Sequence, residues 1–200
     1  MSSESIRRQI CCGRTRERLP NCTFIQASLT TWMPADGSDL LFANGVFQWV
    51  PDHQTVLRRL VETLPRNGVL AVQIPDITEI PALMLLRKLA SWGPWADNPL
   101  MREAVRDELL SPESYYDLLK LLCARVDILH ITYNHILIGP EAIVEWFMGS
   151  ALQPFLSALK PKTTDDFLAA YAVQIDRHHT KRADGRVMLK LPRLFIVATR

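Results

Sequence analysis

Glycine is scarce in this chain, and no two glycines stand two residues apart. The 200 residues contain 8 glycines, where an average usage of about 7% would give roughly 14. Dinucleotide-binding loops and P-loops need closely spaced glycines, because the backbone there must approach phosphate groups. The 200 residues therefore contain neither motif in intact form.

Cysteine is also sparse and shows no metal-binding pattern. The four cysteines, Cys11, Cys12, Cys22 and Cys123, form no C-x-x-C pair and have no histidine at ligand spacing. This argues against a structural zinc site and against a disulfide framework. We expect reduced thiols and no bound metal.

The sequence has no large excess of positive or negative residues and no long apolar run. Lys and Arg number 23 against 21 Asp and Glu, a formal charge of +2, which is far from the basic surplus of nucleic-acid-binding proteins. No apolar run approaches the roughly 18 to 20 residues of a membrane span, and the first 20 residues contain no signal-peptide core. We expect a cytoplasmic protein with neither nucleic acid nor membrane as a partner.

Apolar residues, at 48% of the chain, are abundant enough for one domain over residues 1–200. Continuous apolar runs at 39–44 and 69–74 are typical of strands buried on both faces. Between them, apolar residues recur every three or four positions over Val46 to Leu64, which predicts a helix. Strand, helix and buried strand form a β-α-β unit, so we predict an α/β fold with a parallel sheet.

The remaining segments continue this pattern with two helical interruptions. Residues 77–111, with a helix at 82–90, and residues 140–182 are predicted to be helical insertions. The other predicted elements are a surface helix at 5–18, a strand at 23–28, a helix at 115–123, and strands at 126–138 and 187–198.

Four short sequence segments, in the same order along nearly the whole chain, resemble segments of the trans-aconitate methyltransferases. They lie at 39–44 (DLLFAN), 47–53 (FQWVPDH), 67–76 (NGVLAVQIPD) and 191–198 (LPRLFIVA). The resemblance implies a class I methyltransferase fold, a Rossmann-like sheet that is mostly parallel with an antiparallel last strand, capped by the helical insertions. It also implies S-adenosylmethionine as cofactor and the carboxylate of a small polycarboxylic acid as the methylated group.

The resemblance also marks parts of the family pattern that are missing or changed. The family's first two strands, its glycine-rich loop and its acidic ribose-binding residue precede the point where these residues begin, and Ser28 stands where the family has an adenine-binding Asp. We therefore expect weak or lost cofactor binding. Two interpretations stay open, a carboxylate O-methyltransferase that is inactive as this truncated chain, and a non-catalytic remnant that binds an organic acid or a protein partner.

Two missing strands would leave the apolar strand at 39–44 with a free edge, which is a pairing hazard. We expect that either residues 23–28 move inward to pair beside it, or a second copy covers the edge.

No catalytic side chain is expected. A carboxylate is already ionised at neutral pH, so methyl transfer to its oxygen needs no general base. The resemblance assigns the methionine side of the cofactor to Ala43, Asn44, Gln48 and Trp49. The alternative for these residues is an ordinary Asn-Gly turn and a core tryptophan.

The substrate is expected beside the carboxyl ends of the strands, where open α/β sheets bind ligands. Gln73 ends one strand there, and Arg193 reaches the same end if the last strand is antiparallel. We predict that Arg193 holds a substrate carboxylate; a structural ion pair is the alternative. Tyr133 and His135 share one face of the neighbouring strand and are further candidates, although His135 also fits a core or rim position.

Overall fold

The computed structural model describes residues 17–104 and 109–200, so the helix predicted at 5–18 lies almost wholly outside the described residues. Four strands, β1 (Leu40–Asn44), β2 (Val69–Pro75), β3 (Arg125–Leu137) and β4 (Val187–Thr199), form one sheet in the order β1-β2-β4-β3. β1 and β2 are parallel, and β4 runs antiparallel to both of its neighbours. The predicted α/β sheet with an antiparallel last strand is confirmed.

The segment between β1 and β2 contains two helices where one was predicted. A short 3-10 helix, η1 (Phe47–Trp49), precedes α2 (His53–Thr63). Val50 is extended and Asp52 adopts a left-handed φ of 46°. Pro51 disfavours the helical conformation for the residue before it, so the single helix predicted over 46–64 is interrupted here.

The strand predicted at 23–28 does not form. Ser28 instead starts a turn, in which its carbonyl accepts from the N–H groups of Thr31 and Trp32. Arg59 of α2 donates to the carbonyls of Leu29 and Trp32, which holds this segment against α2. The expected pairing of 23–28 beside β1 is therefore wrong, and within the described residues β1 pairs only with β2.

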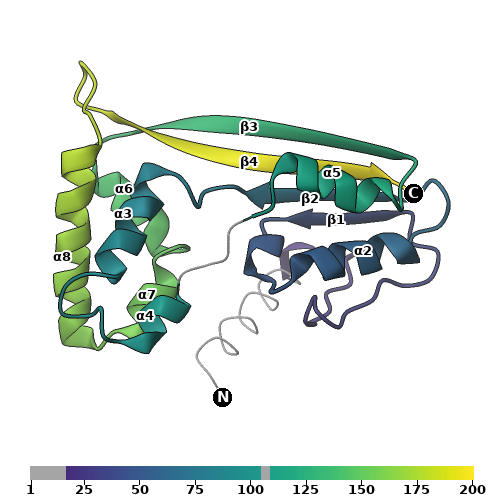
Figure 1. Ribbon diagram of the computed structural model, residues 1–200, viewed down its shortest axis with the longest axis horizontal. Coiled ribbons are helices and arrows are strands. Elements are labelled where there is room, and N and C mark those ends of the chain that lie inside the picture. Colours follow the sequence, from purple (N-terminus) through teal and green to yellow (C-terminus); the bar gives the residue numbers. More distant parts are fainter. Residues whose placement is uncertain (1–16, 105–108) are drawn as a thin grey trace.

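One face of the sheet is covered by α2 and α5 (Pro112–Lys120), as Figure 1 shows. Ser111 caps α5, its Oγ accepting from the N–H of Ser114 at 3.2 Å. The helix ends at Lys120, three residues before the predicted Cys123. Beneath the two helices lies a core of alternate strand residues and helix residues, including Leu57, Ile74, Tyr115, Leu119 and Ile196.

The opposite face is open over β1 and β3 among the described residues. Leu40 and Phe42 of β1 are 60% and 72% exposed, and Leu129 and Ile131 of β3 are also exposed. Leu40 and Phe42 lie on the side of the sheet that faces away from the core beneath α2 and α5. Their cross-strand neighbours on β2, β4 and β3 also lie outside that core. This face therefore carries exposed apolar residues beside polar ones such as Arg125 and Asp127, and it has no covering helix in the described part of the chain.

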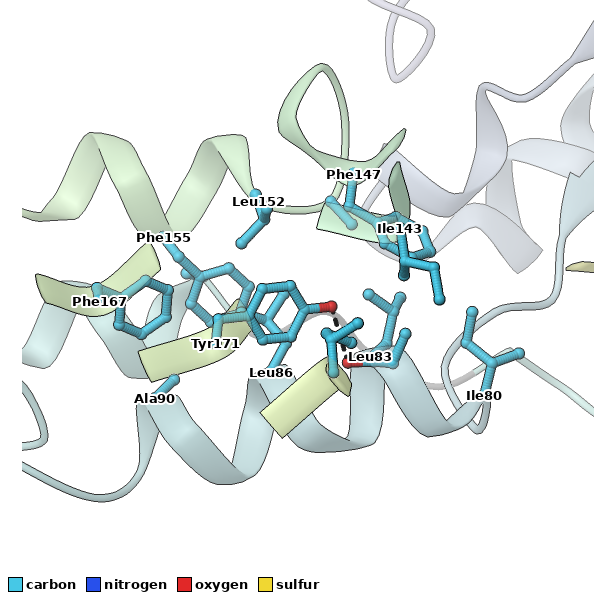
Figure 2. Close-up of a cluster of buried hydrophobic side chains, with 14 of the residues drawn as sticks. Ile80, Leu83, Leu86, Ala90, Ile143, Phe147, Leu152, Phe155, Phe167 and Tyr171 are labelled. Carbon is cyan, nitrogen blue, oxygen red and sulfur yellow. Dashed lines mark hydrogen bonds between the residues drawn. The ribbon is translucent and has the colours of Figure 1, made fainter. Parts of the chain in front are cut away.

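A second core lies beyond the sheet in the helical cap, at the other end of Figure 1. Its helices lie within the segments 77–111 and 140–182, which were predicted to be helical. They are α3 (Pro81–Ala90), α4 (Pro99–Glu103), α6 (Glu141–Met148), α7 (Gln153–Ala158) and α8 (Pro161–His178). Figure 2 shows the packed side chains of this core and the hydrogen bond that the Tyr171 hydroxyl donates to the Ala82 carbonyl at 3.0 Å. The first residues of β4, Val187, Leu189 and Leu191, belong to the same core, so β4 connects cap and sheet.

Candidate functional site

A pocket lies where the carboxyl end of β2 meets the cap. It has about 530 Å³ of empty space and is open to solvent. Pro75, Ile77 and Gln48 form the wall on the sheet side, while Leu83, Leu86, Ala151 and Phe155 form the wall on the cap side. This is the position that the rule for open α/β sheets gives to ligands.

Gln48 is positioned by the turn that follows β1. Gly45 adopts a left-handed φ of 64° and its N–H donates to the Gln73 carbonyl at 2.9 Å, which extends the β1–β2 pairing by one bond. The Nε2 of Gln48 donates back to the Gly45 carbonyl at 2.7 Å. The Oε1 of Gln48 is buried and has no hydrogen-bond partner among the described residues, and a buried acceptor in this state is costly unless a donor reaches it.

Gln73 and Arg193 lie together at the end of the β2–β4 pair. Register places Gln73 opposite Phe195 and Pro75 opposite Arg193, so the antiparallel direction of β4 brings the arginine to the ligand end, as predicted. Gln73 is only 7% exposed, and its Oε1 accepts from Nη1 of Arg193 at 3.4 Å. The Nε2 of Gln73 is buried and has no hydrogen-bond partner within residues 17–104 and 109–200.

Arg193 has no carboxylate partner among residues 17–104 and 109–200. The alternative of a structural ion pair therefore finds no support in the described residues. A guanidinium and an unpaired amide N–H₂ are both donors, and together they can bind an anion such as a carboxylate.

Tyr133 and His135 lie farther along β3, toward the cap. Register places them opposite Leu191 and Leu189. The two rings stack with centroids 6.4 Å apart, and His135 lies 4.6 Å from the Trp146 ring of α6. The three rings connect β3 to α6 of the cap. Tyr133 and His135 lie on the same face of the sheet as Arg193.

The other predicted cofactor residues do not all gather at the site. Asn44 is exposed at the end of β1, and Trp49 is 48% exposed beside it in η1. Ala43 points the other way and packs against the sheet core. Ser28 is exposed in its turn, and its Oγ hydrogen-bonds with Oγ1 of Thr30 at 2.7 Å. Asn44, Gln48, Gln73 and Arg193 are thus neighbours, while Ser28 lies in a separate segment.

Most of the cap tryptophans and phenylalanines have packing roles. Trp95 and Phe147 are buried in the cap core, whereas Trp92 is exposed. The described residues contain no group of three or more potential metal ligands and no helix long and apolar enough to cross a membrane. Cys22 and Cys123 are free thiols, and Cys11 and Cys12 lie outside the described residues.

Two polar side-chain pairs lie behind the site, on the covered face of the sheet. The sequence pattern did not reveal them. Nε2 of His130 lies 3.0 Å from Oδ2 of Asp76, directly after β2, and the Asp76 N–H donates to the Pro192 carbonyl. The Tyr115 hydroxyl lies 2.6 Å from Nε2 of His53 at the start of α2. Burial, with a smaller effect from the charge of Asp76, raises the pKa of Tyr115 to about 12.

Comparisons with known proteins agree with this geometry. The chain is 44% identical over 185 residues to a trans-aconitate 2-methyltransferase of Rhodopseudomonas palustris (strain HaA2), covering 92% of this chain and 72% of the relative. It is 45% identical over 187 residues to the enzyme of the same name from Afipia carboxidovorans, covering 94% and 73%. The crystal structure of the YcgJ protein from Bacillus subtilis aligns with a TM-score of 0.50 at 14% identity, over 94% of this chain and 76% of that one, a likeness of fold alone. No family model matches the chain.

The buried Tyr115 predicts a pH dependence of stability. Its pKa is raised from 10.0 to about 12, so its contribution is complete below pH 10 and is lost as pH rises toward 12. The free energy of unfolding of the wild type should therefore fall with pH more steeply than that of Tyr115→Phe, by about 2 to 3 kcal/mol across this range. Urea unfolding between pH 9 and 12 measures the difference, with Tyr116→Phe, on the exposed side of α5, as a control that keeps the wild-type slope. Equal slopes for wild type and Tyr115→Phe would contradict the assignment.

Proposed function

This chain belongs to the trans-aconitate 2-methyltransferase family, and we propose that its site serves the methylation of a carboxylate on a small polycarboxylic acid such as trans-aconitate. The relatives are named methyltransferases, and the sheet has the class I α/β arrangement. The observation that carries the substrate assignment is the Gln73–Arg193 pair. In the part of the chain that the structure describes, the buried Nε2 of Gln73 has no partner and the Arg193 guanidinium has no carboxylate.

The residues at the pocket perform positioning rather than proton transfer. A substrate carboxylate is ionised at neutral pH and attacks the methyl group directly. Arg193 and Gln73 would hold a carboxylate that is not methylated, because two adjacent donors can bind its two oxygens. Tyr133 and His135 border this position on β3. The apolar cap residues Leu83, Leu86 and Phe155 would exclude water, which strengthens these contacts.

S-adenosylmethionine is the proposed cofactor, and when bound it supplies a methyl group on a sulfonium. The residues fit its methionine end in part. The buried, unpaired Oε1 of Gln48 suits an ammonium donor, and Asn44 and Trp49 lie at the same strand end. The adenine end finds less support, because Ser28 lies in a separate turn and the 200 residues contain no G-x-G loop.

Weak cofactor binding follows for the 200-residue protein. Calorimetric titration with S-adenosylmethionine should give a dissociation constant weaker than about 100 μM, because Ser28 lies in a separate turn and the 200 residues contain no G-x-G loop. Titration of the same sample with trans-aconitate is the control for a folded site. A low-micromolar constant for the cofactor, about −8 kcal/mol, would show that other residues of this chain complete the site.

Replacing Arg193 tests the substrate assignment. Arg193→Ala should weaken the binding of trans-aconitate by about 1.5 to 3 kcal/mol, the usual loss for a charge-assisted contact. Arg125→Ala removes the same charge from the exposed end of β3 and should leave the affinity unchanged. Calorimetry measures both, and circular dichroism checks the fold. Unchanged affinity in a folded Arg193→Ala protein would exclude the carboxylate role, and unfolding would assign Arg193 to the structure instead.

A second candidate function, a non-catalytic binding protein, is favoured by the open outer edge of β1 and the exposed Leu40 and Phe42. A second copy would cover these apolar residues. Sedimentation velocity at tens of micromolar should then show dimers that Phe42→Asp dissociates, while Leu121→Asp, exposed elsewhere, leaves them intact. A monomer at all concentrations would contradict self-association, and methylation of the acid by the purified chain would exclude the non-catalytic role.

A further inference from the structure

Arg87 of α3 is the charged residue among those that line the pocket in the described part of the chain. Its side chain is 26% exposed, and most of its neighbours in the lining are apolar, Leu83, Leu86 and Phe155 among them. A guanidinium placed against apolar walls is costly unless an anion approaches it. The resemblance in sequence gave no indication of this residue.

The hydrogen bonds of Arg87 hold it in place without using all of its donors. Its Nη2 donates to the Thr78 carbonyl and to Oε1 of Glu79 at 2.9 Å. Both bonds use the same nitrogen, so Nη1 and Nε have no partner among the described residues. Glu79 is 69% exposed and pairs with Arg87 from the solvent side.

The helix that carries Arg87 is fixed by the cap core. Leu83 and Leu86 of α3 are buried in that core with Phe155, and the Tyr171 hydroxyl donates to the Ala82 carbonyl in the first turn (Figure 2). Side chains three and four residues apart share one helix face, so Arg87 follows Leu83 on the face that turns toward the pocket. The guanidinium is therefore presented from a rigid wall.

We propose that Arg87 binds the carboxylate of the CH₂COO⁻ arm of trans-aconitate from the cap side, while the Gln73–Arg193 pair binds another carboxylate of the acid from the sheet side. This inference rests on the proposed function and makes it more specific. The pocket adjoins that pair, since Pro75 lines the pocket and lies opposite Arg193 in the sheet. Cations on both sides of an apolar pocket select acids whose carboxylates are separated by a short hydrocarbon unit.

A comparison of two acids tests the inference. Mesaconate is trans-aconitate with its CH₂COO⁻ arm reduced to a methyl group, so it lacks one carboxylate but keeps the unsaturated diacid. The 200-residue wild type should bind trans-aconitate more tightly than mesaconate. Arg87→Met should weaken the binding of trans-aconitate by about tenfold to a hundredfold and that of mesaconate by less than twofold. Lys88→Met, the exposed next residue of α3, is the charge-matched control and should change neither.

Two conservative variants, Arg87→Lys and Glu79→Gln, test the same contact if Arg87→Met does not fold. Arg87→Lys keeps the charge but loses the planar fork, and should weaken the binding of trans-aconitate only. Glu79→Gln removes the competing carboxylate and should strengthen the binding of trans-aconitate severalfold without a change for mesaconate.

Three results would overturn the inference. An equal loss for both acids in Arg87→Met would assign Arg87 a structural role, and unchanged affinities in the folded variants would exclude any role in binding. In both cases the proposed function survives if the wild type binds trans-aconitate. No binding of either acid by the wild type would contradict the proposed function and this inference with it.

Discussion

The antiparallel pairing of β4 with β2 is the constraint on which the site depends. It places Arg193 opposite Pro75 and so brings a cation to the end of the sheet where ligands bind. A parallel β4 would carry Arg193 away from that end. The same pairing lets β4 continue into the cap core through Leu189 and Leu191, so one strand positions both the proposed anion-binding pair and the cap beside the pocket.

The sheet has two faces of different character. The covered face supports the site through the His130–Asp76 and His53–Tyr115 pairs, which hold the end of β2 and the start of α2. The opposite face carries exposed apolar residues on β1 and β3 among the described residues, and contiguous apolar surface of this kind marks an interaction site. The described residues hold the proposed substrate residues in place more fully than the proposed cofactor residues.

The sequence was sufficient for the elements with strong local signals. Strands 39–44, 69–74, 126–138 and 187–198 and the two helical insertions all appear within a few residues of their predicted bounds. The prediction at 23–28 was wrong because these residues pair with no strand of the described chain, and strand propensity alone does not form a strand without such a partner. Gln73 and Arg193 could be proposed from their places in the strands, whereas Arg87 could not, because its role depends on how the cap packs beside the sheet.

The central claim is that a small polycarboxylate binds between Gln73–Arg193 and the cap. Nuclear magnetic resonance of the ¹⁵N-labelled protein, titrated with trans-aconitate, tests it most directly because side-chain N–H groups report on the contact itself. The account predicts the largest shifts at Nε2 of Gln73 and the Nε–H groups of Arg193 and Arg87. Shifts confined to the open face around Leu40, Phe42 and Leu129, or no shifts at millimolar acid, would contradict it.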